Sequence, residues 1–155
     1  ILLFRIRNLL VATYLGLQFF TIRDIQPLSY FPKNRPSAFI AYKHGDDMHR
    51  FFVEYIPTGT AISTIRGKLK HYSAYFQQDA WGVTDTPFPR VLYICEDGLT
   101  EQGVRYHMKR ELYRADTDIE YFTTTKKAIL NLAINDRIWT AVDNSEEIIS
   151  LTSFS

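Results

Sequence analysis

The chain has 155 residues, of which 46% are hydrophobic and 23% are charged, a composition typical of one globular domain rather than of a disordered segment. The 18 basic and 17 acidic side chains give a net charge of +1 at pH 7, which favours no class of partner. The single cysteine, Cys95, excludes a disulfide framework and any cysteine-based zinc module, and its place in the apolar run 91–95 indicates a buried, unreactive thiol in a reducing compartment.

The first twenty residues are apolar enough to raise the question of a membrane-spanning helix. Arg5, Arg7 and Gln18 interrupt the run, whereas a spanning helix needs about 20 predominantly apolar residues. The stretch also has no small-residue cleavage pattern of the kind that ends a signal peptide. We therefore expect a core helix over 1–17, a cytoplasmic protein and no membrane partner. Because the chain starts at Ile1 rather than Met, we also expect a fragment or a processed product.

The next segments predict β structure. Residues 19–26 are rich in strand-forming types and predict a strand, and the stretch that follows, up to Pro36, contains three prolines and predicts a loop. Residues 37–42 and 50–56 are apolar runs on either side of a polar tip. This pattern predicts a β-hairpin.

The stretch 51–76 organises the expected fold. Its aromatic and β-branched first residues suit a half-buried strand, and Pro57 and Gly59 forbid further strand. Either Thr58 or Thr60 is expected to cap the helix that follows. Apolar residues recur in this helix at spacings of three and four, which predicts one stripe facing a core. The stripe consists of Ile62, Ile65, Leu69, Tyr72 and Phe76.

Charged residues lie on the two flanks of this stripe. At about 100° per residue, Lys68 falls on one flank beside Tyr72, while Arg66 and Lys70 fall on the other flank. Glu54 is close to the end of the preceding strand. We therefore expect Glu54 and Lys68 to approach each other.

The rest of the chain predicts alternating strands and helices after a long, turn-rich connection. The expected elements are a buried strand over 90–95, a helix over 99–114 capped by Thr100, a strand over 119–123, a short helix over 125–132 capped by Thr125, and a strand over 137–142. The whole pattern predicts an α/β fold with a partly antiparallel mixed sheet flanked by helices. We expect a single domain over 1–142 and a C-terminal tail over 143–155, which is frayed or a linker.

Short motifs over 35–94 carry a resemblance to a known family. They are Arg35-Pro36, Phe52-Val53-Glu54-Tyr55, Thr58-Gly59-Thr60, Lys68 with Leu69 and Tyr72, and Pro89-Arg90-Val91-Leu92, with weaker matches at Phe122-Thr123-Thr124 and Trp139. These residues resemble the nuclease-like domain of the replication-relaxation family of plasmids and other mobile elements of bacteria. That domain belongs to the restriction-endonuclease-like, or PD-(D/E)xK, superfamily. The resemblance implies an αβββαβ core and a DNA-binding domain preceding it.

The chain departs from the superfamily pattern at two positions. The first metal-binding acid is expected after the proline, where this chain has Ser37. A lysine, or an aspartate in the relaxation family, is expected two residues after Glu54, where this chain has Ile56. Phosphodiester hydrolysis on this fold needs at least two carboxylates for Mg²⁺ and a lysine beside the attacking water. Glu54 is the only carboxylate in place, and Lys68 can replace the missing lysine but not the missing acid.

The resemblance therefore implies a degenerate catalytic site marked by Glu54 and Lys68, with Glu54 as the only metal ligand if a metal is bound at all. Basic and aromatic residues on the organising helix are the candidates for phosphate contact and base stacking. They are Arg66, Lys68, Lys70, His71 and Tyr72, with Tyr75 beside them. The alternative to DNA contact is that these residues only form the exposed, charged face of a helix and bind no partner.

Other acidic and histidine residues have simpler structural explanations. His44, Asp46, Asp47 and His49 resemble a metal-ligand cluster, but Gly45-Asp46 is also a common hairpin-turn sequence. Candidate replacement carboxylates for the degenerate site are Asp85, Glu96 and Asp97, but acids in such places usually end a strand.

Three functions remain open on the sequence. The first is a DNA-binding, catalytically inactive nuclease-like domain in the replication or mobilisation of a plasmid or mobile element, with no cofactor and with a protein partner from that machinery. The second is an active Mg²⁺-dependent DNA endonuclease that uses Glu54 and Lys68. The third is a protein-interaction or oligomerisation module.

Overall fold

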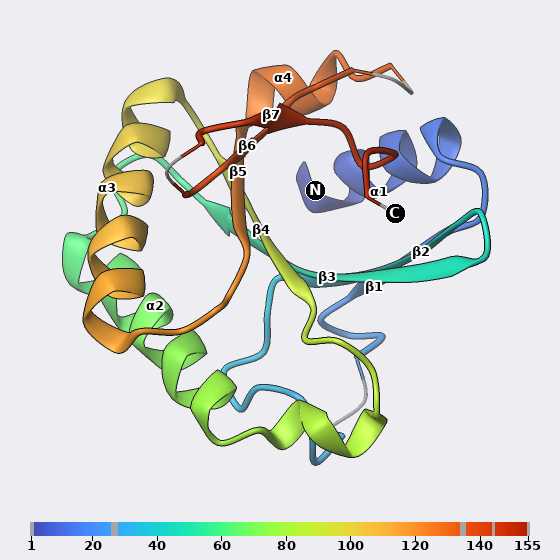
Figure 1. The fold of residues 1–155 in the computed structure, drawn as a ribbon. Coiled ribbons are helices and arrows are strands. Elements are labelled where there is room, and N and C mark those ends of the chain that lie inside the picture. The colour runs from blue at the N-terminus through green and yellow to red at the C-terminus, as the bar shows by residue number, and fades with distance from the viewer. Residues whose placement is uncertain (1, 26–27, 134–135, 144, 155) are drawn as a thin grey trace.

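The computed structural model describes residues 2–25, 28–133, 136–143 and 145–154. Within these residues one mixed sheet of seven strands runs in chain order from β1 to β7, with helices on both faces (Figure 1). The elements are α1 (Leu2–Thr13), β1 (Leu17–Thr21), β2 (Ala38–His44), β3 (Asp47–Ile56), α2 (Ile62–Gln77), the 3₁₀ helix η1 (Ala80–Thr84), β4 (Arg90–Cys95), α3 (Gly98–Ala115), β5 (Tyr121–Thr125), α4 (Lys126–Leu130), β6 (Trp139–Ala141) and β7 (Ile148–Ile149).

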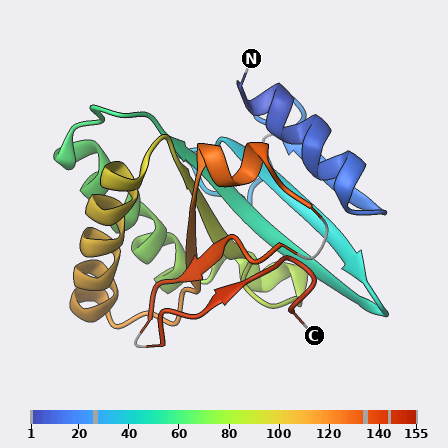
Figure 2. The ribbon, with the colours of Figure 1, turned by 90° about the horizontal axis from the view of Figure 1, so that it is seen from above.

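Strand direction divides the sheet into three parts. β1, β2 and β3 form an antiparallel meander, β3, β4 and β5 run parallel, and β5, β6 and β7 are antiparallel again. α2 and α3 connect the parallel strands and cover one face, whereas α1 and α4 lie on the other face (Figure 2). The expected α/β class with a mixed sheet flanked by helices is confirmed, and the element order from α1 to β4 is the expected αβββαβ.

Side chains alternate along β3, so the strand supplies both faces of the sheet. Phe51 and Val53 enter the core on the α1 face, while Phe52 and Ile56 enter the core on the α2 face. Glu54 has the same parity as Phe52 and Ile56. It therefore points towards α2, and this alternation decides which helix covers its carboxylate.

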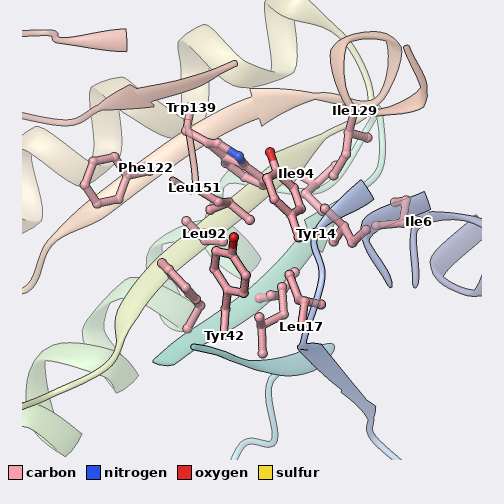
Figure 3. Close-up of a cluster of buried hydrophobic side chains, with 14 of the residues drawn as sticks. Ile6, Tyr14, Leu17, Tyr42, Leu92, Ile94, Phe122, Ile129, Trp139 and Leu151 are labelled. Carbon is pink, nitrogen blue, oxygen red and sulfur yellow. The ribbon is translucent and has the colours of Figure 1, made fainter. Parts of the chain in front are cut away.

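The core on the α1 face is shown in Figure 3, where Tyr14, Tyr42 and Trp139 lie among aliphatic side chains from α1, the sheet and the C-terminal segment. The rings of Tyr14 and Tyr42 pack with centroids 5.5 Å apart. Cys95, on the other face, is fully buried, and burial raises the pKa of its thiol to about 12. The expected burial of this cysteine is confirmed.

Several element boundaries and caps differ from the expectations. α1 ends at Thr13 rather than at residue 17. β1 ends at Thr21, where the Asp24 carboxylate accepts hydrogen bonds from the Thr21 backbone N–H and hydroxyl and so forms a turn. Neither threonine caps α2, which begins after Ala61 with no side-chain cap. Asp97, not Thr100, caps α3, because its carboxylate accepts from the Thr100 N–H at 2.8 Å.

Residue 26, the end of the strand expected over 19–26, lies outside the described residues. Thr125 caps α4 as expected, by accepting from the Ala128 N–H. Ile62 was expected on the buried stripe of α2, but it is exposed, because the helix begins at this residue and its first turn extends beyond the core.

The segment assigned to a C-terminal tail adds a strand to the sheet. In β7, Ile149 pairs with Trp139 of β6, and Leu151 beyond it is fully buried in the core of the α1 face. The fold therefore extends past residue 142 into the stretch assigned to the tail. None of the helices in the described residues is both long enough and apolar enough to span a bilayer.

Candidate functional site

The pairing of β2 with β3 brings Ser37 to Glu54. Ala38 lies opposite Val53 in the antiparallel register, so Ser37, one residue before β2, falls beside Glu54. The Ser37 hydroxyl donates to Glu54 Oε1 at 3.4 Å and accepts from the Tyr55 N–H at 3.3 Å. The position where the superfamily pattern expects its first acid is thus adjacent to the only carboxylate that the pattern retains.

Helix α2 covers this pair with a lysine and a tyrosine. Lys68 and Tyr72 are four residues apart and therefore share one helix face. The Lys68 ammonium lies 3.3 Å from Glu54 Oε1, and the Tyr72 hydroxyl donates to Glu54 Oε2 at 2.6 Å. Glu54 is only 3% exposed and Lys68 is 36% exposed. The expected approach of Glu54 and Lys68 is confirmed.

Burial dominates the electrostatics of Glu54. It raises the pKa of the carboxyl above its ordinary value, although Lys68 and the hydrogen bonds from Tyr72 and Ser37 act in the opposite direction. Burial, followed by the neighbouring Glu54, also raises the pKa of Tyr72 well above its ordinary value. Tyr72 therefore stays protonated and remains a hydrogen-bond donor to Glu54.

The residues of this site do not fit a Mg²⁺ ion. Mg²⁺ requires oxygen ligands, typically one or two carboxylates with several waters, whereas Glu54 is buried and already accepts from three side chains. The polar groups that contact Glu54 are two hydroxyls and an ammonium, and the ammonium supplies the positive charge that a metal ion would otherwise bring. Among the described residues, no group of three or more histidine, cysteine, aspartate or glutamate side chains could hold a metal ion.

Two further tyrosines from the sheet form the floor of the site. Tyr93 of β4 lies opposite Glu54 in the parallel register, and Tyr121 of β5 packs edge-on against Tyr93 with ring centroids 6.0 Å apart. The hydroxyls of both are buried and have no hydrogen-bond partner among the described residues. The floor is therefore aromatic and largely apolar, which explains the strong effect of burial on Glu54.

Helix α2 separates the basic residues that were predicted to contact DNA. Lys68 and His71 lie on the Glu54 side, where His71 Nε2 accepts from the Asn34 N–H at 3.3 Å. The pKa of His71 is lowered by burial and then by the nearby Lys33 and Lys68. Arg66 and Lys70 instead line a groove against α3.

The prediction that Tyr72 stacks on bases is wrong, because Tyr72 is only 2% exposed and its hydroxyl is used by Glu54. Tyr75 is also buried, with its hydroxyl donating to the Tyr30 carbonyl. Tyr72 belongs to the apolar stripe of α2, and Tyr75 is buried in the same core cluster. Neither ring is accessible to a nucleic acid.

A groove of about 590 Å³ between α2 and α3 was not predicted as a site. Its signal in the sequence was the excess of basic residues on the helix now seen as α3, together with two tyrosines in that helix. The residues that line the groove are Arg66, Leu69, Lys70, Tyr106, His107, Lys109, Arg110, Glu111, Tyr113 and Arg114. Arg105 is excluded from it, because its guanidinium donates to Thr123 and to two backbone carbonyls of the β6 region.

The remaining candidate acids have structural roles. Glu96 accepts from the Thr58 N–H at 2.5 Å, and Asp97 accepts from the Thr58 hydroxyl at 2.8 Å. Together they join the ends of β3 and β4 at the start of α3. Asp85 ends η1 in a left-handed conformation, with φ of 54°. None of these carboxylates is among the hydrogen-bond partners of Glu54.

Comparison with known proteins assigns no family to the chain. No protein-family model, curated protein or solved structure matches it. The fold and the site together define an α/β domain in which a buried glutamate, a serine and a lysine meet at the edge of the parallel strands.

Proposed function

We propose that this chain is a restriction-endonuclease-like domain that binds DNA and does not cleave it. The observation that carries the proposal is the meeting of Ser37, Glu54 and Lys68 at one point of the structure. A catalytic site of this superfamily would place its first acid, its second acid and its lysine around one metal. Here the three positions come together, but the first of them is a hydroxyl.

The element order from α1 to β4 supports the proposal, because the resemblance to the superfamily implies an αβββαβ core. The position of Lys68 supports it as well. The pattern expects a lysine two residues after Glu54, where the strand carries the buried Ile56, yet a lysine reaches the same carboxylate from α2 at 3.3 Å.

The metal ligands that the site offers argue against cleavage. Metal-dependent phosphodiester hydrolysis needs a cation that lowers the pKa of a water and stabilises the transferred charge. The Glu54 carboxylate is almost fully buried and is neutralised by Lys68, so it has neither the partner acid nor the accessible oxygens that a cation requires.

DNA contact is supported by the cations around this site. The exposed Lys33 and Arg35 lie in the loop before β2, and Lys68 and His71 lie on the facing flank of α2. Phosphate neutralisation by lysine and arginine releases counterions and supplies most of non-specific DNA affinity. We further propose a cytoplasmic role in the replication or mobilisation of a plasmid or mobile element, together with a protein partner from that machinery. The resemblance to the replication-relaxation family implies this role.

One observation favours an active endonuclease as the second candidate. The contact between Glu54 and Lys68 resembles the acid and the lysine of a catalytic site. A carboxylate from a partner protein, or oxygens of the substrate phosphate, would then complete the oxygen ligands of the metal. This candidate requires Lys68 to leave the carboxylate when the metal arrives.

A plasmid assay across a salt series separates these candidates. The purified chain and its Glu54→Ala variant are incubated with supercoiled plasmid and Mn²⁺, and nicking and mobility shift are followed together. The proposal predicts intact DNA that shifts at low salt, with an affinity that falls steeply as salt rises. Nicking by the wild type that is lost in Glu54→Ala would establish the endonuclease instead.

Charge-matched variants test the location of the contact. Lys68→Gln removes the positive charge beside Glu54 and Lys33→Gln removes one near His71, whereas Arg5→Gln removes an exposed charge from α1 on the opposite face of the sheet. The proposal predicts that the first two weaken the shift and that Arg5→Gln does not. Self-association that is insensitive to salt, with no DNA shift, would favour the protein-interaction module.

A further inference from the structure

Two tyrosines on α3 are exposed far beyond what their size favours. Tyr106 is 55% exposed and Tyr113 is 90% exposed, although large aromatic rings are usually buried at least in part. They are seven residues apart, so they lie on one side of the helix about 10 Å from each other along its axis. Both line the groove against α2. Their exposed faces are therefore available at a concave surface.

The groove between α2 and α3 keeps a positive charge after the side chains that form ion pairs are set aside. Glu111 pairs with Arg114 at 2.7 Å, and Glu146 pairs with Lys109 at 2.5 Å. Three cations remain without a carboxylate partner among the described residues. They are Arg66 and Lys70 of α2 and Arg110 of α3.

Arg110 connects the charges to the aromatic surface. Its guanidinium lies 5.6 Å from the centroid of the Tyr106 ring and donates to the Tyr106 hydroxyl at 3.0 Å. Between the two helices, the pKa of His107 is lowered by burial and then by the positive charges of Arg66 and Arg110. The cations of α2 and α3 therefore act on the same volume of the groove.

We infer that the groove between α2 and α3 holds an unpaired DNA strand, with phosphates on Arg66, Lys70 and Arg110 and bases stacked on Tyr106 and Tyr113. Aromatic rings within a basic groove are the features by which proteins bind single strands, because every base has a face that can stack. The bases of a duplex are already stacked on each other and offer no face to an exposed tyrosine.

The shape of α3 agrees with a strand that lies along it. Gly103 lies one turn before Tyr106 on the same side of the helix, and a methyl group there would meet no atom within 4 Å. Gly103 is not among the residues that line the groove, but space beside α3 stays open one turn before the first of the two tyrosines. The groove is on the flank of α2 opposite Lys68 and His71, so it is separate from the Glu54 site.

This inference rests on the proposed DNA binding and adds a second surface, which binds DNA in its unpaired form. The test measures fluorescence anisotropy of a labelled 20-nucleotide thymidine strand and of a labelled 20-base-pair duplex with the full chain at low salt. The variants are Tyr106→Ala, Tyr113→Ala and Arg110→Gln. The controls are Leu99→Ala, an exposed apolar residue of α3 outside the groove, and Arg5→Gln on α1.

Each tyrosine variant is expected to weaken binding of the single strand roughly 5- to 150-fold, the range measured when a stacking aromatic is replaced by alanine. Tyr113→Phe should retain binding, because stacking requires the ring and not the hydroxyl. Duplex affinity should change less than twofold in the tyrosine variants, and the controls should match the wild type. Circular dichroism confirms that the exposed substitutions leave the fold intact.

The outcomes separate the failure of this inference from the failure of the proposed function. Single-strand affinity within twofold of wild type in both tyrosine variants would overturn the inference alone. An equal loss for strand and duplex would also overturn it, since the groove would then bind phosphates without reading unpaired bases. If the wild type bound neither probe at low salt, both the inference and the proposed function would fail.

Discussion

The two flanks of α2 present opposite environments to whatever approaches the protein. On one flank, Lys68 and Tyr72 close over the buried Glu54, and every hydrogen bond of the carboxylate is made inside the protein. On the other flank, Arg66 and Lys70 face an open groove with exposed tyrosines. One helix thus separates a buried site, the proposed nuclease remnant, from an exposed surface, the proposed strand-binding groove. Burial, more than residue type, decides what each flank can do.

The largest expected effect on stability is at the buried flank. Tyr72→Phe removes a 2.6 Å hydrogen bond to a buried carboxylate and should lower the free energy of unfolding by about 1.5–3 kcal/mol. Tyr93→Phe is the matched control, because its equally buried hydroxyl has no partner among the described residues and its loss should be neutral or stabilising. Denaturant unfolding of both variants measures the difference. An equal loss in the two would show that the Glu54 hydrogen bond contributes nothing specific.

The second effect is a change in pH dependence at Glu54. Because burial raises the pKa of this carboxyl in the folded chain above its ordinary value of 4.5, the folded state binds the proton more tightly than the unfolded state. Its contribution to stability is complete below pH 4.5 and is lost as the pH rises through the folded pKa. The groups that face it are Ser37, Lys68, Tyr72, Tyr93 and Tyr121.

Glu54→Gln removes this ionisation. The free energy of unfolding of the wild type, relative to the variant, should therefore fall from pH 4.5 upwards and level off above the folded pKa. Urea unfolding at several pH values measures the difference. A difference that stayed constant with pH, or rose with it, would mean that Lys68 outweighs burial.

A smaller effect is expected at the open flank from Gly103. Gly103→Ala should raise the free energy of unfolding by about 0.5–1 kcal/mol, because the position is inside α3 and a methyl group meets nothing. Gly16 provides the contrast, since its φ of 81° disfavours any side chain and Gly16→Ala should destabilise. Thermal unfolding measures both. A loss of stability in Gly103→Ala would show that this side of α3 is more crowded than described.

The smallest effect on stability is expected where the charges are exposed. The double variant Arg66→Gln and Lys70→Gln should change the free energy of unfolding by less than about 0.5 kcal/mol, because both side chains are exposed. It should nonetheless reduce the slope of log affinity for single-stranded DNA against log salt by about 1.4, or about 0.7 for each phosphate contact on a single strand. An unchanged slope would remove both residues from the binding surface.

The sequence predicted the order of helices and strands well, because most elements have clear apolar periodicity and strong turn residues. It also predicted the approach of Glu54 to Lys68, which follows from the place of Glu54 near the end of its strand and of Lys68 on one flank of the helix. It did not predict β7, since the two residues Ile148–Ile149 are too few to show alternation. It did not predict the cap of α3 either, because Asp97 and Thr100 are both suitable by type, although it did predict the Thr125 cap of α4.

The candidate site was predicted only in part. Tyr72 was assigned both to the apolar stripe of α2 and to the DNA-binding set, and only tertiary packing on the sheet shows that the stripe prevails. The groove was missed because its residues come from two helices separated in the sequence. Arg66 and Arg110 line the same groove only because both connections between parallel strands lie on the same face of the sheet.

The central claim, that the site is a nuclease-type metal centre lacking its first acid, is tested most directly by Mn²⁺ binding to the wild type and to Ser37→Asp. The variant places a carboxylate beside Glu54 at the position where Ser37 now lies 3.4 Å from it. Isothermal titration calorimetry should show no binding by the wild type and one Mn²⁺ site in Ser37→Asp that is lost again on adding Glu54→Gln. Mn²⁺ binding by the wild type that depends on Glu54 would contradict the account.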